Sequence, residues 1–98
     1  NNNKIMNTNY EVIEKEAIEN LHFPEIDVLD DIEAINQRNS DLERALSLGN
    51  LEHSKIKIYF EDNKSKKMVE TTIWGVTDKR VILKKGVVIP INRIYKSI

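Results

Sequence analysis

The chain has 98 residues, with 15 basic and 16 acidic side chains, 40% hydrophobic residues and no cysteine. This length suffices for one small domain and excludes a large enzyme core, and the lack of cysteine excludes disulfides and thiolate metal sites. No apolar stretch approaches the roughly 20 residues of a membrane-spanning helix, and no secretory signal pattern opens the chain. We therefore expect a cytoplasmic protein that does not enter a membrane.

The net charge of −1 combines two halves of opposite sign. Residues 1–47 hold four basic and eleven acidic side chains, a balance of −7, whereas residues 48–98 hold eleven basic and five acidic ones, a balance of +6. Such an asymmetry is typical of a polyanion-binding module joined to an acidic segment. Two charged faces that attract one another within the fold would give the same counts, so both interpretations stay open.

The first half is predicted to be helical. Residues 1–8 are rich in asparagine and lack periodicity, so we expect a disordered N-terminus, with Met6 a candidate natural start. Residues 9–48 form the predicted acidic helical segment. A capping box at Thr8 and Glu11, followed by apolar residues at helical spacing, predicts a first helix that ends at Phe23, just before Pro24.

A heptad-like seam follows, with spacings of 4, 3, 4, 3 and 4 residues, and suggests contact with a partner or a second copy: Val28, Ile32, Ile35, Asn39, Leu42 and Leu46. Ser40 and Glu43 form a second capping box beside the polar Asn39. We therefore expect a break there, then a short helix over 41–48 with Gly49 as its C-cap. One continuous helix packed on its own domain is the alternative.

Residues 49–98 are predicted to form a basic β-barrel domain. Apolar side chains alternate with polar ones over 55–61, β-branched and aromatic residues fill 68–77, and Gly86 separates two short apolar runs. With a last strand after Pro90, this predicts five short antiparallel strands, and closing them into a small barrel removes their open edges. The predicted fold class is α+β, with acidic helices followed by a small five-stranded barrel.

The short helix at 41–48, the five bent strands and the closing run Ile89-Pro90-Ile91-Asn92-Arg93-Ile94 resemble the small barrel of Sm-like proteins, of the Hfq and LSm type, over roughly 41–98. The resemblance implies an Sm-like or SH3-like barrel, RNA binding and assembly into oligomers in a bacterial protein. The chain departs from the family at its first turn, Asp62-Asn63-Lys64, and has Asn92-Arg93 where the family carries a Lys-His pair. A shorter similarity links 76–83 to a strand pair of bacterial pleckstrin-like domains.

No catalytic motif, phosphate loop or metal-ligand spacing occurs, so we expect no enzyme, cofactor or metal site. Trp74 is the one large aromatic that could stack on a base, but it lies in a dense apolar run and is predicted to pack in the core or the barrel wall. The candidate nucleic-acid contacts are cations, with Tyr59 for stacking and Asn92 for base edges: Lys55, Lys57, Tyr59, Lys79, Arg80, Lys84, Lys85, Asn92 and Arg93.

These patterns predict a non-catalytic regulatory protein that binds RNA or another polyanion, or that works in a transcription-linked complex. We expect a homo-oligomer or a subunit of a larger complex. A protein–protein interaction module, whose basic half meets an acidic partner, is the alternative function.

Overall fold

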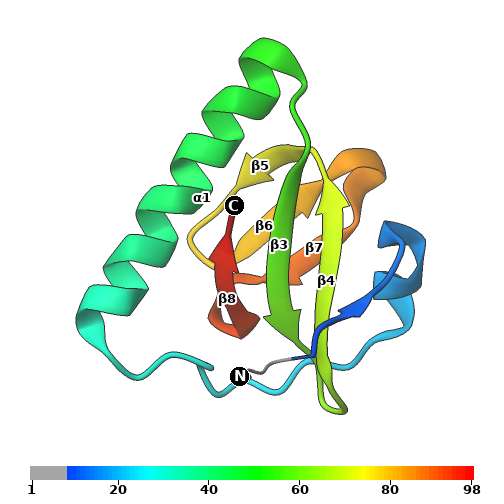
Figure 1. The fold of residues 1–98 in the computed structure, drawn as a ribbon, viewed down its shortest axis with the longest axis vertical. Coiled ribbons are helices and arrows are strands. Elements are labelled where there is room, and N and C mark those ends of the chain that lie inside the picture. Colours follow the sequence, from blue (N-terminus) through cyan, green and yellow to red (C-terminus); the bar gives the residue numbers. More distant parts are fainter. Residues whose placement is uncertain (1–8) are drawn as a thin grey trace, which may run out of the picture.

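The computed structural model describes residues 9–98, so the disorder expected of residues 1–8 lies outside the described residues. The described chain is α+β, with one long helix, α1 (Ile32–Glu52), beside two small sheets (Figure 1). The strands are β2 (Glu11–Val12), β3 (Ile56–Glu61), β4 (Lys66–Thr71), β5 (Ile73–Val76), β6 (Arg80–Leu83), β7 (Val88–Pro90) and β8 (Ile94–Ser97). Short 3-10 helices join them: η1 (Lys15–Asn20), η2 (Lys84–Gly86) and η3 (Ile91–Arg93).

The strands are divided between two sheets. A four-stranded sheet has the order β2-β4-β3-β8, in which β2 runs parallel to β4 and the other neighbours are antiparallel. A three-stranded antiparallel sheet has the order β5-β6-β7. Only Thr72 separates β4 from β5, so one bent run of chain contributes to both sheets. The closed five-stranded barrel predicted from the sequence is not confirmed.

The alternation predicted for the second half is confirmed in β3, where Ile56, Ile58 and Phe60 are buried and the residues between them are not. The hairpin predicted around Gly86 is confirmed as well. It joins β6 to β7 through η2, and Gly86 has a φ of +83°, which suits a residue without a Cβ. Period-2 patterning therefore located these strands correctly.

One core joins both sheets to α1. Leu42 of α1 is completely buried together with Phe60, Ile73 and Ile89, and Ile18 of η1 belongs to the same cluster. Burying each such side chain contributes about 1.5–3 kcal/mol. Segments 9–48 and 49–98 are therefore packed as one unit, and Figure 1 shows α1 lying beside β5 and β8.

The first predicted helix is wrong. Glu11 and Val12 are extended and pair with Lys67 and Met68 of β4, and only the short η1 follows them. Pairing with β4 satisfies backbone groups that the capping box was expected to satisfy. Thr8, the other member of that box, lies outside the described residues.

The predicted break at Asn39 is also wrong, because α1 continues through it. Asp31 caps the N-terminus, where its carboxylate accepts a hydrogen bond from the Ala34 N–H at 3.0 Å. Arg38 and Leu42 are buried one turn apart, so a single buried stripe runs past the second capping box. Tertiary packing on that stripe overrides the local signal of Ser40 and Glu43.

Gly49 does not end α1, contrary to the prediction. The helix runs to Glu52, and His53 ends it with a φ of 55° and an N–H bonded to the Gly49 carbonyl. A Cβ on Gly49 would lie 2.5 Å from the Ile73 carbonyl oxygen. Glycine is needed here because helix and strand approach closely.

Candidate nucleic-acid interface

The structure separates the nine predicted nucleic-acid contacts into three groups. One lies on or beside β3, one at the two ends of β6, and one in η3. These groups are, in that order, Lys55, Lys57 and Tyr59; Lys79, Arg80, Lys84 and Lys85; and Asn92 and Arg93.

The η3 group is largely engaged inside the molecule. Arg93 is 7% exposed, and its guanidinium donates to the carbonyls of Glu61 at 3.0 Å and Ile26 at 2.6 Å. The prediction that Arg93 contacts phosphate is therefore corrected, because the side chain is buried and its donors are used. The Asn92 amide donates to the Glu25 carbonyl at 2.5 Å. These bonds hold residues 21–31, which we call the strap, against η3.

An ion pair between a buried arginine and a partly exposed aspartate also anchors the strap. The Arg38 guanidinium donates to both carboxylate oxygens of Asp27, at 2.8 and 2.9 Å, and to the Ile94 carbonyl at 3.0 Å. Hydrogen bonding from Arg38 lowers the pKa of Asp27 below its ordinary value of 3.8, despite the opposing effect of burial. No short-range spacing pattern marks a pair eleven residues apart, so the sequence does not reveal it.

Tyr59 lies on the outer face of the four-stranded sheet but is not free. Its ring packs against the ring of Tyr10 at 4.8 Å between centroids, and the Lys96 ammonium lies 5.1 Å from its centre. Tyr95 joins the cluster, and burial together with a hydrogen bond to Glu61 raises the pKa of Tyr95 to about 12. These rings already have neighbours, and they hold the N-terminal segment on the sheet.

Trp74 is a large aromatic residue that is exposed to solvent. Its side chain is 53% exposed, so the prediction that it packs in the core is wrong. The pairing of β5 with β6 shifts register between Ile73 and Gly75. A bulge of this kind re-aims one side chain, and Trp74 is the residue within it, next to the fully buried Ile73.

Four exposed cations lie in or next to the three-stranded sheet that holds Trp74. Lys79 and Arg80 precede or begin β6, and Lys84 and Lys85 follow it. None forms an ion pair with a carboxylate of residues 9–98. We call the solvent side of β5-β6-β7, defined by Trp74 and these four cations, the basic sheet face.

The two turns of this face have fixed backbones. The Thr77 hydroxyl accepts hydrogen bonds from the N–H groups of Lys79 at 3.2 Å and Arg80 at 2.9 Å. In η2, Lys85 and Gly86 both have positive φ, 69° and 83°. The half-buried Ile82 and the exposed Val88 lie directly opposite one another between the two turns. The face therefore offers an apolar centre with cations at both ends.

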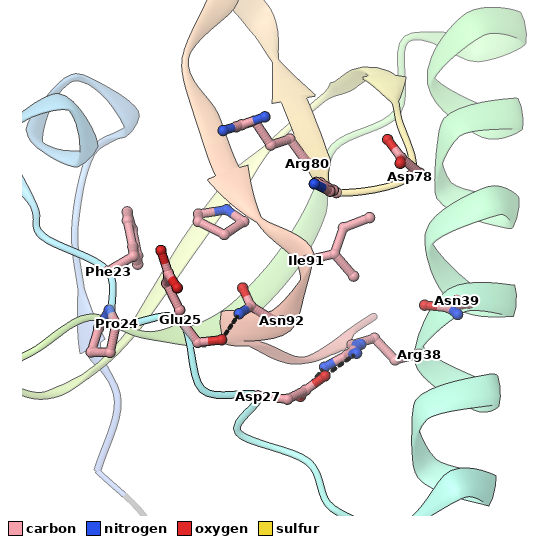
Figure 2. A pocket seen from close by; sticks show the side chains of 12 residues that line it. Phe23, Pro24, Glu25, Asp27, Arg38, Asn39, Asp78, Arg80, Ile91 and Asn92 are labelled. Atoms are coloured by element: carbon pink, nitrogen blue, oxygen red, sulfur yellow. Dashed lines mark hydrogen bonds and ion pairs between the residues drawn. The ribbon is translucent and has the colours of Figure 1, made fainter.

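A pocket of about 660 Å³ adjoins the basic sheet face. The strap, α1, the β5–β6 turn and the β7–η3 segment surround it, and Figure 2 shows the side chains that line it. Arg80 and Pro90 line the pocket and are paired across β6 and β7, so this pair borders both the pocket and the face.

The predicted partner seam mostly contacts the chain itself. Leu42 is fully buried, Leu46, Ile35 and Val28 are half-buried, and only Ile32 and Asn39 are exposed. The alternative of one continuous helix packed on its own domain is the arrangement observed. Asn39 lines the pocket instead of a helix–helix interface.

Residues 9–98 contain no cluster of three His, Cys, Asp or Glu side chains that could hold a metal ion. Within the same residues, every helix is too short or too polar to cross a membrane. No protein-family model matches the chain, and no curated protein or solved structure matches it significantly.

Proposed function

We propose that the chain is a non-catalytic regulatory protein that binds single-stranded RNA on the basic sheet face. The observation that carries the proposal is that the exposed Trp74 lies in a sheet whose β6 strand and turns carry four cations without an ion pair among residues 9–98. Base stacking on an aromatic side chain contributes about 1–3 kcal/mol and tolerates any sequence. Cations around such a ring attract the phosphates.

The dimensions of β6 suit an extended strand of nucleic acid. At about 3.3 Å per residue, the ends of β6 that carry Arg80 and Lys84 are roughly 13 Å apart. Two or three nucleotides of a single strand can span that length. Duplex RNA is less suited, because its bases are stacked on one another and closed to Trp74.

The ion pairs of the molecule also favour an external anion. Among the ion pairs of residues 9–98, only Lys67 with Glu11, at 3.7 Å, joins the acidic half to the basic half. Lys85 also contributes to lowering the pKa of Glu16, after hydrogen bonds from the Glu16 backbone and Lys15, but it forms no direct ion pair with Glu16. Most of the positive charge of the second half is therefore not paired with the first half. It remains available to a polyanion.

We also propose that the fold is a variant of the Sm-like small barrel. The support is the order of elements, a helix followed by five strands, when β4 and β5 are counted as one bent strand. In this proposal the missing closure between β7 and β8 is the main departure from the family.

A second candidate function is protein–protein interaction within an oligomer or a larger complex. Three large apolar side chains on the strap and α1 are mostly exposed and favour it: Ile26 at 78%, Ile32 at 66% and Leu51 at 77%. Light scattering tests this candidate, because a monomer that co-purifies with no partner contradicts it.

The RNA proposal is tested by titrating the chain into a labelled twelve-nucleotide single-stranded RNA at 50 and 200 mM salt. Trp74 is the only tryptophan, so its fluorescence reports stacking directly. We expect quenching, and a loss of about tenfold in affinity when Lys84→Glu and Lys85→Glu are combined. The slope of log affinity against log salt should fall by about 1.4, since each single-strand phosphate contact contributes about 0.7.

The matched control reverses the charge of two exposed lysines of the four-stranded sheet region, Lys55→Glu just before β3 with Lys57→Glu in β3. This pair changes the net charge by the same amount but lies away from the basic sheet face. It should weaken RNA binding by less than about threefold, because salt screens the interaction between distant charges and the RNA. The proposal fails if neither anisotropy nor Trp74 fluorescence changes at 50 mM salt. It also fails if the control pair weakens binding as much as the Lys84 and Lys85 pair. Single-stranded DNA of the same sequence tests the preference for RNA.

A further inference from the structure

We propose that the pocket beside the basic sheet face binds a guanine base. This inference rests on the proposed function: if RNA binds the basic sheet face with one phosphate at Arg80, the next base along the strand would enter the pocket. The pocket volume of about 660 Å³ falls within the range of small-molecule sites and leaves room for a purine.

The walls of the pocket suit a flat aromatic ring. Phe23 and Pro24 contribute from the strap, and Ile91 faces them across the pocket (Figure 2). Pro90, the residue before Ile91, also lines the pocket. Phe23 is half-buried and is itself backed by the ring of Phe60 at 6.1 Å, so its position is fixed. A base between these walls would exchange water for apolar contact on its faces.

The Arg38–Asp27 ion pair forms the floor of the pocket, where Arg38 Nε is the one buried guanidinium donor without a hydrogen-bond partner in the described residues. Arg38 and Asp27 form two hydrogen bonds with one another there. Their charges cancel within the pocket. The base is therefore selected by the other polar groups.

Lys79 and Arg80 supply the cations at the border of the pocket, and three of the remaining polar groups supply acceptors. The Asn92 amide nitrogen is turned toward the Glu25 carbonyl, which leaves its side-chain oxygen on the pocket side (Figure 2). The carboxylates of Glu25 and Asp78 also line the pocket, and neither forms an ion pair within residues 9–98. Guanine presents adjacent N1–H and N2–H donors, and a carboxylate can accept both. Uracil offers one donor and adenine a single amino group, so both match these acceptors less well.

The route of the RNA connects the pocket to the face. Lys79 and Arg80 stand at the shared border, and Arg80 pairs with Pro90 across the sheet. A phosphate at this border leaves the next base at the mouth of the pocket. The pocket would thus read one guanine, whereas Trp74 would stack on a base of any type.

Calorimetric titrations with free GMP and with IMP, which differ only in the 2-amino group, test the pocket without a strand. We expect GMP to bind about tenfold more tightly than IMP, since a bidentate contact to a base provides discrimination of this order. Glu25→Gln should reduce the ratio to about two. Glu43→Gln, an exposed glutamate of α1 outside this pocket, should leave the ratio unchanged.

The same variants are then titrated with an RNA of twelve uridines, which tests the basic sheet face alone. Equal affinities for GMP and IMP, no GMP binding, or an unchanged ratio in Glu25→Gln would each overturn the guanine pocket, whatever the uridine strand does. If GMP is preferred but neither the uridine strand nor the labelled twelve-nucleotide RNA binds, the guanine pocket stands and the proposed RNA face is overturned. Support for both requires that Glu25→Gln bind the uridine strand within about twofold of the unaltered chain.

Discussion

Two groups of positive side chains in this molecule differ in what surrounds them. In the interior, each cation is less than a tenth exposed and has carboxylate or carbonyl partners: Arg38, Lys67 and Arg93. On the basic sheet face, the cations are exposed and have no ion pair within residues 9–98. The same residue types therefore serve the fold in one region and remain available for a ligand in the other. Partner geometry, not composition, makes this difference.

The comparison predicts its largest effect at Arg38. Arg38→Ala leaves the Asp27 carboxylate without its partner and removes the link between α1 and the strap. Breaking a buried pair in this way costs about 3–5 kcal/mol. We expect about 3 kcal/mol, since the Asp27 side chain is 31% exposed and water compensates part of the loss. Urea unfolding at pH 7 measures the change in the free energy of unfolding.

The matched variant is Arg80→Ala on the basic sheet face. It removes the same side chain from an exposed site without an ion pair in residues 9–98, so the change should stay within about 0.5 kcal/mol. Equal losses of unfolding free energy in the two variants would contradict this distinction, because interior and surface arginines would then contribute equally to stability.

A somewhat smaller effect is expected at Lys67, the interior lysine. Its ammonium donates to Asp62 at 3.0 Å, and Asp62 is 2% exposed. Lys67→Met keeps most of the volume but leaves the carboxylate with only the Ser65 and Lys64 N–H donors. We expect a loss of about 2 kcal/mol and a rise in the pKa of Asp62, which carboxyl NMR shifts follow against pH. An unchanged Asp62 pKa in the variant would contradict the role given to Lys67.

Acid tests the interior region without a mutation. Arg38 lowers the pKa of Asp27, and at Asp62 the Ser65, Lys67 and Lys64 donors outweigh burial and lower the pKa as well. A carboxyl whose folded pKa is depressed adds stability above its unfolded value of about 3.9. That stability is lost as the pH falls through the folded pKa. The free energy of unfolding should hence change little from pH 7 to 5 and fall below about pH 4, and Arg38→Ala should flatten the fall.

Much of the second half was predictable from sequence because its strands pair locally. Period-2 alternation identified β3, and the Gly86 turn identified the β6–β7 hairpin. The first half was not predictable in this way. Glu11 and Val12 become a strand only because β4, more than fifty residues later, supplies a partner. Local capping signals cannot register a contact of that range.

The candidate site was predicted only in part, for the same reason. The exposed lysines of η2 lie at a turn, as expected, because turns run over the surface. Arg93 was assigned to the surface, but its partners come from the strap and from the end of β3. Trp74 was assigned to the core, but the bulge in β5 turns it outward. Register shifts and long-range carbonyl partners leave no periodic mark in the sequence.

A small effect on stability is also expected at Trp74, the aromatic residue of the basic sheet face. A side chain that is 53% exposed contributes only part of the burial that a core tryptophan would. Trp74→Ala should therefore lower the free energy of unfolding by less than about 1.5 kcal/mol, against about 3–5 kcal/mol for a core Trp→Ala change. The same variant should weaken binding of single-stranded RNA about tenfold, and Trp74→Phe should restore part of that loss because a phenyl ring still stacks. Urea unfolding and RNA titration of both variants give the two numbers. A large loss of stability with no loss of RNA affinity would place Trp74 with the interior residues and remove the basis of the proposed interface.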